Sequence, residues 1–173
     1  LINKIIYNLY FMFYKYNSMD YLKNKFIDSF EFFGSPNYNQ ITKNIYLGNY
    51  KACKLNSINK ENFDIVINCT PKLPFYSDKT INYRINVKDD LAYHSNILLA
   101  QYIHKILPII HKHIQDNKKI LIHCRAGMQR SAAVTTCYLM KYHNLNSKDA
   151  MRYVKHKRPV AFLSGSNFYT TIK

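Results

Sequence analysis

The chain has 173 residues, 47% of them hydrophobic, which is enough to bury one core and excludes an intrinsically disordered protein. Its formal net charge of +15 favours anionic partners: phosphoproteins, nucleic acid or acidic lipid. An AT-rich genome would produce the same excess of Lys, Asn, Ile and Tyr, and no block of like charges forms a nucleic-acid-binding tail.

The first residues of the chain are expected to lie outside its globular part. Residues 5–14 are apolar and aromatic, but the run is too short to span a bilayer and no small-residue cleavage site follows it. We therefore predict a leader over residues 1–18, upstream of a start at Met19, and no membrane span.

Residues 19–33 show helical spacing of apolar side chains, and residues 34–40 are rich in Gly, Ser, Pro and Asn. These patterns predict an amphipathic helix and a hinge, so that the domains are 1–18, 19–36 and 37–173.

Short apolar runs alternate with helical patterns over the rest of the chain. Strands are predicted at 45–47, 64–68, 81–87 and 119–123, with a loop at 71–78. Helices are predicted at 95–115 with a kink at Pro108, at 131–142, from an N-cap at Ser147 to about 157, and from about 166 onward. This alternation predicts an α/β fold with a mainly parallel central sheet flanked by helices.

One segment of the sequence carries the chemistry. Residues 123–131 read HCRAGMQRS and join a predicted strand to a predicted helix. A turn in this context can direct successive backbone N–H groups and the positive end of a helix at a phosphate, and glycine gives it conformational freedom. We therefore predict a phosphate-binding loop made of Cys124, Arg125, Ala126, Gly127, Met128, Gln129 and Arg130, with His123 before it and Ser131 after it.

Each polar side chain of this segment has a predicted role. Cys124 would have a depressed pKa, because its thiolate faces N–H donors, a helix dipole and Arg130, and a thiolate is a strong nucleophile toward phosphorus. Arg130 would grip two phosphate oxygens with its planar fork. Ser131 would hydrogen-bond to the sulfur and help it leave, and His123 would hold the loop without touching the substrate. The leaving oxygen needs an acid, for which Asp89 and Asp90 are the candidates.

The pattern His-Cys-x-x-Gly-x-x-Arg-Ser resembles the phosphate loop of protein tyrosine phosphatases. Residues 45–49, 132–140 and 154–159 resemble the dual-specificity branch of that family, so the resemblance runs from about 41 to 159. The stretch IYLGNYK and the Asp89-Asp90 pair are most similar to a poxvirus virion phosphatase of this branch.

The resemblance implies a dual-specificity phosphatase fold with a catalytic domain at 37–173. It implies hydrolysis of phosphotyrosine, phosphoserine and phosphothreonine in proteins through a cysteinyl-phosphate intermediate, with no cofactor. The family's Ile-x-Val-x-Asp pattern matches residues 85–89 and selects Asp89 over Asp90. The family often has an Asn-containing turn after 158–159, whereas this chain has SGSN at 164–167, for which we predict no role.

Three other functions stay open on the same sequence. The basic charge is consistent with an RNA 5′-phosphatase. The phosphate loops of such enzymes, however, have His after the first variable position, and these enzymes lack the Asp acid. A phosphoinositide phosphatase tends to carry extra lysines where this chain has Met128 and Gln129. A non-catalytic phosphoprotein-binding module would usually have lost Cys124, Arg130 or the acid. Phosphorylated proteins are therefore the expected partners, and nucleic acid is not required.

The cysteines and histidines indicate the redox compartment of the protein and whether it holds a metal ion. Cys53, Cys69 and Cys137 lie among apolar neighbours and are expected to be core residues, without a disulfide framework. This predicts an intracellular, cytoplasmic protein, or one of the virion or host cytoplasm if it is viral. His104, His111 and His113 are expected to be solvated on the helix at 95–115, and no metal site is predicted. The resemblance also implies a possible homodimer through the helix at 19–33.

Overall fold

A five-stranded sheet forms the centre of the computed structural model, which describes residues 35–54, 62–163 and 165–173. The strands are β1 (Tyr38–Gln40), β2 (Ile45–Gly48), β3 (Ile65–Asn68), β4 (Ile81–Arg84) and β5 (Ile120–His123). Their order is β1-β2-β5-β3-β4. Only the β1–β2 pair is antiparallel among these, which confirms the predicted α/β fold with a mainly parallel sheet. The predicted leader and the helix at 19–33 lie outside the described residues.

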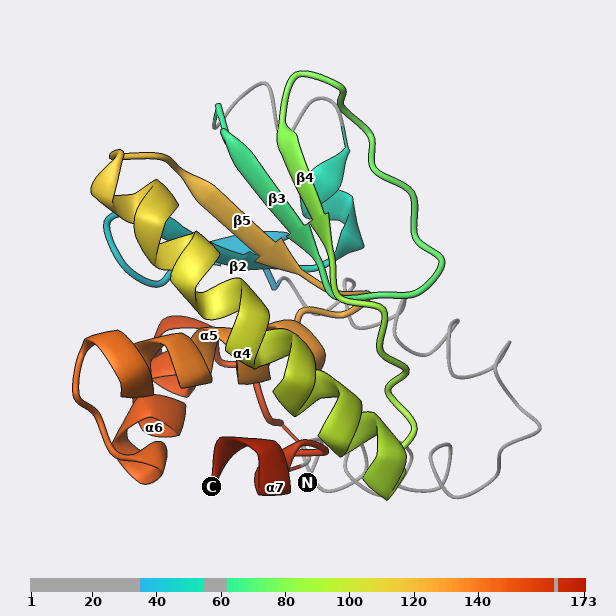
Figure 1. Cartoon of the computed structure of the whole chain (residues 1–173), viewed down its shortest axis with the longest axis vertical. Coiled ribbons are helices and arrows are strands. Elements are labelled where there is room, and N and C mark those ends of the chain that lie inside the picture. The colour runs from blue at the N-terminus through green and yellow to red at the C-terminus, as the bar shows by residue number, and fades with distance from the viewer. Residues whose placement is uncertain (1–34, 55–61, 164) are drawn as a thin grey trace.

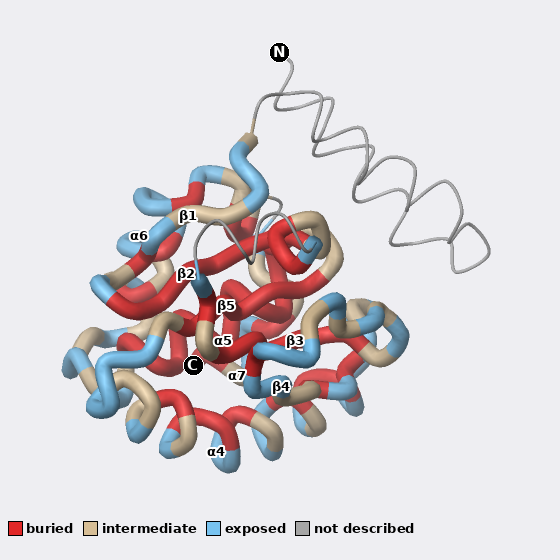
Figure 2. Tube along the Cα trace, turned by 90° about the horizontal axis from the view of Figure 1, so that it is seen from above, coloured by how far each residue is buried: buried red, intermediate tan, exposed pale blue. Residues whose placement is uncertain are grey.

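Helices cover the sheet mainly on one side (Figure 1). α4 (Tyr93–Gln115) and α5 (Arg130–Tyr142) lie on this side, and α6 (Ser147–Lys157) and α7 (Tyr169–Ile172) pack against α5. The short 3₁₀ helix η2 (Tyr50–Cys53) packs on the other face. Figure 2 shows β2, β3 and β5 as buried tubes, whereas the outward turns of α4 are exposed. None of the helices in these described ranges is long and apolar enough to cross a membrane.

The two faces of the sheet are separated by the alternation of side chains along each strand. Ile45 and Leu47 of β2 contribute to the larger core, which also includes Leu99 of α4 and Ala132 of α5. Tyr46, between them, points to a smaller cluster on the other face. The remaining members of that cluster are Ala52, Cys53, Phe63, Val66 and Leu121. Burial on both faces explains why β2, β3 and β5 consist mostly of apolar residues.

The predicted strand at 81–87 is too long, because β4 ends at Arg84. Arg84 pairs with Asn68, the last residue of β3, so the ladder has no further partner. The Ile85 N–H still donates to the Asn68 carbonyl at 2.9 Å, and the Val87 N–H then donates to the Ile85 carbonyl at 3.0 Å. The chain therefore turns at 85–87 toward the carboxyl edge of the sheet.

Helix starts also differ from the prediction. α4 begins at Tyr93 and continues through Pro108 as one helix. The N-cap of α6 is Asn146, not Ser147, since the Asn146 side chain accepts from the Asp149 N–H at 2.9 Å. The last helix, α7, begins at Tyr169 and not near 166.

Two short elements were not predicted. β1 occupies residues 38–40, the last part of the expected hinge, and pairs with β2 from Tyr38↔Gly48 to Gln40↔Tyr46. Residues 38–40 thus belong to the sheet, within the predicted catalytic domain at 37–173, and the predicted hinge is limited to the residues before Tyr38. η2 is capped by Asn49, whose side chain accepts from the N–H groups of Lys51 and Ala52. Neither element is long enough to show a periodicity in the sequence.

Candidate active site

The segment 123–131 lies at the carboxyl edge of the parallel sheet. β5 is flanked by β2 and β3, and its last residue, His123, pairs with Gly48 on one side and Asn68 on the other. α5 begins at Arg130, immediately after the loop. In open α/β sheets the crevice at the carboxyl ends of the strands binds ligands, and a helix N-terminus there favours an anion. The segment therefore has the setting of a phosphate site.

Gly127 is needed for the path of this loop. Its φ of +66° lies in the left-handed region that side chains with a Cβ resist. A Cβ at this position would also meet the Gly48 carbonyl oxygen at 2.5 Å and the Arg158 guanidinium at 2.8 Å. Any other residue would push the loop away from β2 and from Arg158.

Arg158 holds the buried side of the loop, a role that the sequence did not reveal. The side chain is only 1% exposed, and it donates from Nε to the Gly127 carbonyl at 2.8 Å and from Nη2 to the Ala126 carbonyl at 3.2 Å. Nη1 donates to the Pro36 carbonyl and to Asn39 Oδ1. Burial lowers the pKa of Arg158 to about 10, so the group remains charged at neutral pH. The guanidinium therefore satisfies carbonyls that would otherwise be buried without donors.

Cys124 is fully buried at the start of the loop, and the Ser131 hydroxyl donates to its sulfur at 3.2 Å. Burial raises the pKa of the thiol and Asp89 acts in the same direction. The Arg130 charge and the hydrogen bonds from the Ser131 hydroxyl and backbone N–H lower it, and the net pKa falls below the ordinary 9.0. The site therefore favours a thiolate.

The other three cysteines, Cys53, Cys69 and Cys137, are buried and unpaired, which confirms them as core residues. Burial is the main cause that raises the pKa of each thiol, to about 12 for Cys137. Of the four, Cys124 alone has a lowered pKa. The nucleophile expected from the motif is therefore also the reactive thiol that the geometry favours.

Arg130 connects the loop to the segment that follows β4. Its Nη1 donates to the Val87 carbonyl at 3.2 Å, and its Nε lies 3.4 Å from Asp89 Oδ2. Both side chains of this ion pair are mostly buried. The structure thus brings Asp89 to the residue that neighbours the thiolate.

Asp90, the alternative acid, is placed differently. It is exposed, and its Oδ1 accepts from the Ala92 backbone N–H at 3.1 Å in the turn that leads into α4. Asp89 instead accepts at Oδ1 from the Asn167 side-chain amide at 2.7 Å. The geometry therefore favours Asp89 as the acid and gives Asp90 a role in the turn.

The remaining loop residues bind neighbouring segments. Gln129 is buried, donates from Nε2 to the Gly165 carbonyl at 2.8 Å and accepts at Oε1 from the Asn167 N–H at 3.0 Å. Met128 is also buried, and its carbonyl accepts from the Phe162 N–H at 3.0 Å. With both side chains turned into the protein, these residues can offer a phosphate only their backbone N–H groups. Gln129 and Asn167 lie far apart in sequence, which is why their contact was not predicted.

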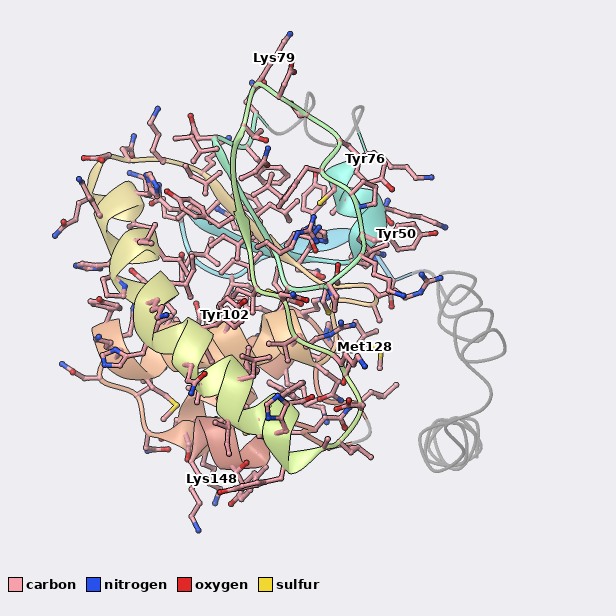
Figure 3. The ribbon with its side chains drawn as sticks, turned by 45° about the vertical axis from the view of Figure 1, so that its right-hand side comes forward. Tyr50, Tyr76, Lys79, Tyr102, Met128 and Lys148 are labelled. Carbon is pink, nitrogen blue, oxygen red and sulfur yellow. The ribbon has the colours of Figure 1, made fainter. Side chains whose placement is uncertain are left out.

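The rim of the loop carries Arg125, whose guanidinium lies over the Tyr50 ring at 5.5 Å from its centroid. The Arg125 carbonyl accepts from the Tyr50 N–H at 3.0 Å. Figure 3 shows Tyr50 and Met128 on the same side of the molecule. These contacts give the loop an aromatic and cationic border that suits a phosphorylated side chain.

His123 is fully buried, and its Nδ1 lies 3.4 Å from the Cys124 carbonyl. Burial is the main cause that lowers its pKa to about 4, so the ring is neutral near pH 7 and its Nδ1–H can donate to that carbonyl. This position suits a residue that supports the loop and does not touch substrate.

The histidines of α4 are only partly as expected. His104 is exposed, but His111 hydrogen-bonds to the Tyr138 hydroxyl at 3.1 Å and His113 to the Tyr83 hydroxyl at 3.0 Å. The prediction of solvated side chains is therefore wrong for these two. Within the described ranges, no three His, Cys, Asp or Glu side chains gather so that they could hold a metal ion.

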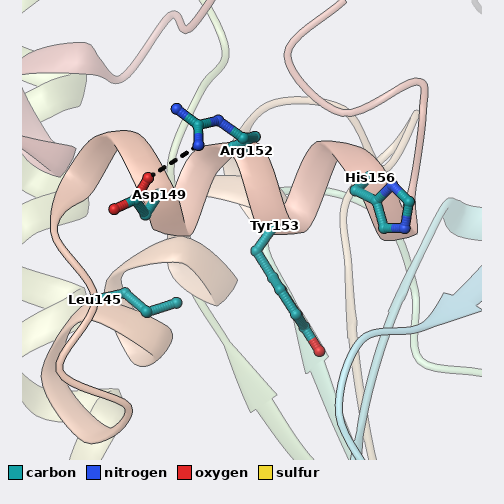
Figure 4. A pocket seen from close by; sticks show the side chains of 5 residues that line it. All are labelled: Leu145, Asp149, Arg152, Tyr153 and His156. Carbon is teal, nitrogen blue, oxygen red and sulfur yellow. Dashed lines mark ion pairs between the residues drawn. The ribbon is translucent and has the colours of Figure 1, made fainter.

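A separate pocket lies on α6 and the turn before it (Figure 4). It is lined by Leu145, Asp149, Arg152, Tyr153 and His156. Asp149 and Arg152 form an exposed ion pair with 3.3 Å between Oδ1 and Nη1. No residue of the segment 123–131 lines this pocket, so the chemistry of the thiolate is located elsewhere.

Comparison with known proteins assigns the family. Residues 45–173 match the family model of the dual specificity phosphatase catalytic domain, so the chain belongs to that family. Among its relatives, the tyrosine phosphatase-like protein 123R of Invertebrate iridescent virus 6 is 34% identical over 71% of this chain and 81% of its own length. Human dual specificity protein phosphatase 9 is 31% identical over 69% of this chain but only 31% of its own length. The crystal structure of human DUSP28 superposes with a TM-score of 0.70 at 24% identity, covering 79% of this chain and 90% of that one, which shows the shared fold.

The family and these relatives confirm the predicted activity class, a protein phosphatase for phosphotyrosine and phosphoserine or phosphothreonine. The viral relatives also agree with the predicted resemblance to viral enzymes.

Proposed function

We propose that this phosphatase acts through a cysteinyl-phosphate formed on Cys124. The observation that carries the proposal is the buried sulfur of Cys124, held 3.2 Å from the Ser131 hydroxyl and with a pKa lowered by Arg130 and Ser131 against the effect of burial. A thiolate at the base of an anion-binding loop is a nucleophile aimed at phosphorus.

In the first step, the loop N–H groups and the Arg130 fork bind the phosphate oxygens. The Cys124 sulfur attacks phosphorus, and the bond from phosphorus to the substrate oxygen breaks. Asp89 gives its proton to that oxygen, so the product leaves as a neutral alcohol or phenol. Arg130 stabilises the charge on the equatorial oxygens while the bonds exchange.

In the second step, water attacks phosphorus and the bond to sulfur breaks. Asp89, now a carboxylate, accepts a proton from the water, and the electron pair returns to Cys124. The hydroxyl of Ser131 stabilises the leaving thiolate, consistent with its 3.2 Å hydrogen bond to the sulfur. Phosphate is released and the enzyme regains its starting state.

The proposed partners are phosphorylated proteins in a reducing compartment, either the virion or the host cytoplasm. The unpaired cysteines and the viral relatives support this location. A homodimer through residues 19–33 remains part of the proposal, although that segment lies outside the described residues.

Assays on a phosphotyrosine peptide, a phosphothreonine peptide, an RNA 5′-triphosphate and a phosphoinositide test the proposal side by side. The wild type should hydrolyse both peptides in the presence of EDTA. Cys124→Ser should abolish turnover but retain peptide binding, because a serine hydroxyl there is not ionised. Asp89→Asn should lower kcat by roughly 10²–10⁴-fold, the usual scale of general acid catalysis, with Asp90→Asn as the matched control.

Turnover by the Cys124→Ser protein would remove this residue from the nucleophile role. If the Asp90→Asn variant lost activity and Asp89→Asn did not, the acid would have to be reassigned.

A further inference from the structure

Asn167 contacts the proposed acid from the segment before α7, for which no role was predicted. Its side-chain Nδ2 donates to Asp89 Oδ1 at 2.7 Å. The other oxygen of that carboxyl, Oδ2, lies 3.4 Å from Arg130 Nε. The carboxyl is therefore held from two sides, with Oδ1 turned to Asn167 and Oδ2 turned to the arginine that binds phosphate.

We propose that Asn167 is a positioning residue that fixes which oxygen of Asp89 delivers the proton. This inference rests on the proposed role of Asp89 as general acid, and it adds a residue that links the phosphate loop to that acid.

The backbone of Asn167 is anchored on both sides of its side chain. Its N–H donates to Gln129 Oε1 at 3.0 Å, and its carbonyl accepts from Asn96 Nδ2 of α4 at 3.1 Å. Gln129 belongs to the phosphate loop, is 1% exposed and is itself fixed by donating to the Gly165 carbonyl at 2.8 Å. The amide of Asn167 is thus presented to Asp89 by a segment tied to the phosphate loop and to a long helix, which is the arrangement that preorganises a catalytic group.

The chemistry of the amide sets the location of the proton. A side-chain NH₂ group can only donate, so Asp89 Oδ1 must accept and cannot carry the acidic hydrogen toward Asn167. Arg130 can also only donate, but its Nε is 3.4 Å from Oδ2 in an ion pair, whereas Oδ1 already accepts a hydrogen bond at 2.7 Å. Oδ2 is therefore the oxygen that carries the hydrogen in the protonated acid. Oδ2 gives this proton to the leaving oxygen in the first step and takes one from water in the second. No covalent bond of Asn167 forms or breaks in either step, and it transfers no proton.

Two variants of Asn167 test this role. Asn167→Ala removes the amide, and Asn167→Asp keeps the shape and both backbone anchors but replaces the donor with an oxygen. Both should lower kcat on the phosphotyrosine and phosphothreonine peptides by roughly 10- to 100-fold, less than the complete loss of the acid. Both should change kcat/KM on 2,4-dinitrophenyl phosphate little, because kcat/KM reports only the first step and that leaving group departs without a proton.

Three readouts separate positioning from a general effect on the fold. Vanadate affinity and the rate of Cys124 alkylation should stay at the wild-type level, since the phosphate loop keeps its other contacts. In the Asp89→Asn background, Asn167→Ala should cause no further loss. Thr170→Val is the matched control, because Thr170 lies in the same C-terminal segment and bonds to Asn96 but not to Asp89.

Several outcomes would overturn the inference. An equal loss on all substrates, weaker vanadate binding, or no loss on the peptides would show that Asn167 does not act on proton transfer. A further loss in the Asp89→Asn background would show that it acts independently of Asp89. If Asp89→Asn lost as much activity on 2,4-dinitrophenyl phosphate as on the peptides, Asp89 would not be the general acid. This result tests the proposed acid separately, because Asn167 is unchanged in that variant.

Discussion

At the scale of single residues, the chemistry depends on how Ser131 and Arg130 offset the burial of Cys124. A fully buried thiol is expected to stay protonated, as burial makes the other cysteines do. Cys124 differs because a guanidinium charge and two hydrogen bonds from Ser131 stabilise its anion. The reactivity of the sulfur is therefore a property of its neighbours.

Ser131→Ala should raise the pKa of Cys124, because one of the groups that lowers it is removed. Since the wild-type pKa is depressed, the thiolate is lost as pH falls through that value. In the variant it should be lost already at a higher pH. The pH dependence of Cys124 alkylation by iodoacetamide measures this directly. Thr135→Ala is the control, because Thr135 bonds to the Ser131 carbonyl and not to the sulfur. An unchanged midpoint in the Ser131 variant would contradict the role of the hydroxyl.

The sequence predicts those candidate site residues that come directly after a predicted strand. Segment 123–131 and Asp89 follow short strands, and a local motif places their side chains at the same sheet edge. Arg158 and Asn167 could not be assigned in this way, since the loop carbonyl bound by Arg158 is 31 residues away and Asp89 is 78 residues from Asn167. Such contacts depend on the packing of whole elements, which one sequence does not reveal.

At the scale of elements, the phosphate loop is supported from behind by the residue that ends α6. Arg158 is the C-cap of α6, and its guanidinium joins Gly127 of the loop to Asn39 of β1. This contact also gives β1 a function, although its polar sequence did not predict a strand. A short edge strand thus helps to position the site.

Arg158→Met should lower the free energy of unfolding by about 1–3 kcal/mol or more, the usual cost of leaving a buried acceptor without its donor. The loop carbonyls of Ala126 and Gly127 would lose their donor, so vanadate binding should weaken as well. Urea unfolding at neutral pH and vanadate titration measure the two effects.

The matched control for this test is Arg152→Met on the same helix. Arg152 is exposed and pairs only with Asp149 at 3.3 Å among the contacts that the structure describes, so the change should be within about 0.5 kcal/mol. If Arg158→Met were as mild as the control, Arg158 would not be a support of the loop.

At the scale of the whole molecule, the site is assembled where the carboxyl ends of β3, β4 and β5 meet the N-terminus of α5. The turn after β4 supplies Asp89, the loop after β5 supplies Cys124 and Arg130, and the segment before α7 supplies Asn167. The net charge of +15 adds a general attraction for anionic substrates. The fold class and the proposed nucleophile could be predicted from periodicity and motif, whereas the contacts of Arg158 and Asn167 depend on how the assembled elements pack.

The last prediction concerns assembly of two chains through residues 19–33. Their apolar stripe, with several Phe side chains at helical spacing, is costly to leave in water and has to pack on this domain or on a partner. Exchange of the helix across a two-fold axis would bury it and hold two active sites on one body.

Light scattering at micromolar concentration compares a chain that begins at Met19 with one that begins at Ser35. The shorter chain retains Pro36, whose carbonyl accepts from Arg158 at 3.0 Å, so its catalytic domain should stay active. A dimer for the longer chain and an active monomer for the shorter one are expected. If both were monomers, the stripe would pack on its own domain and the exchange would be excluded.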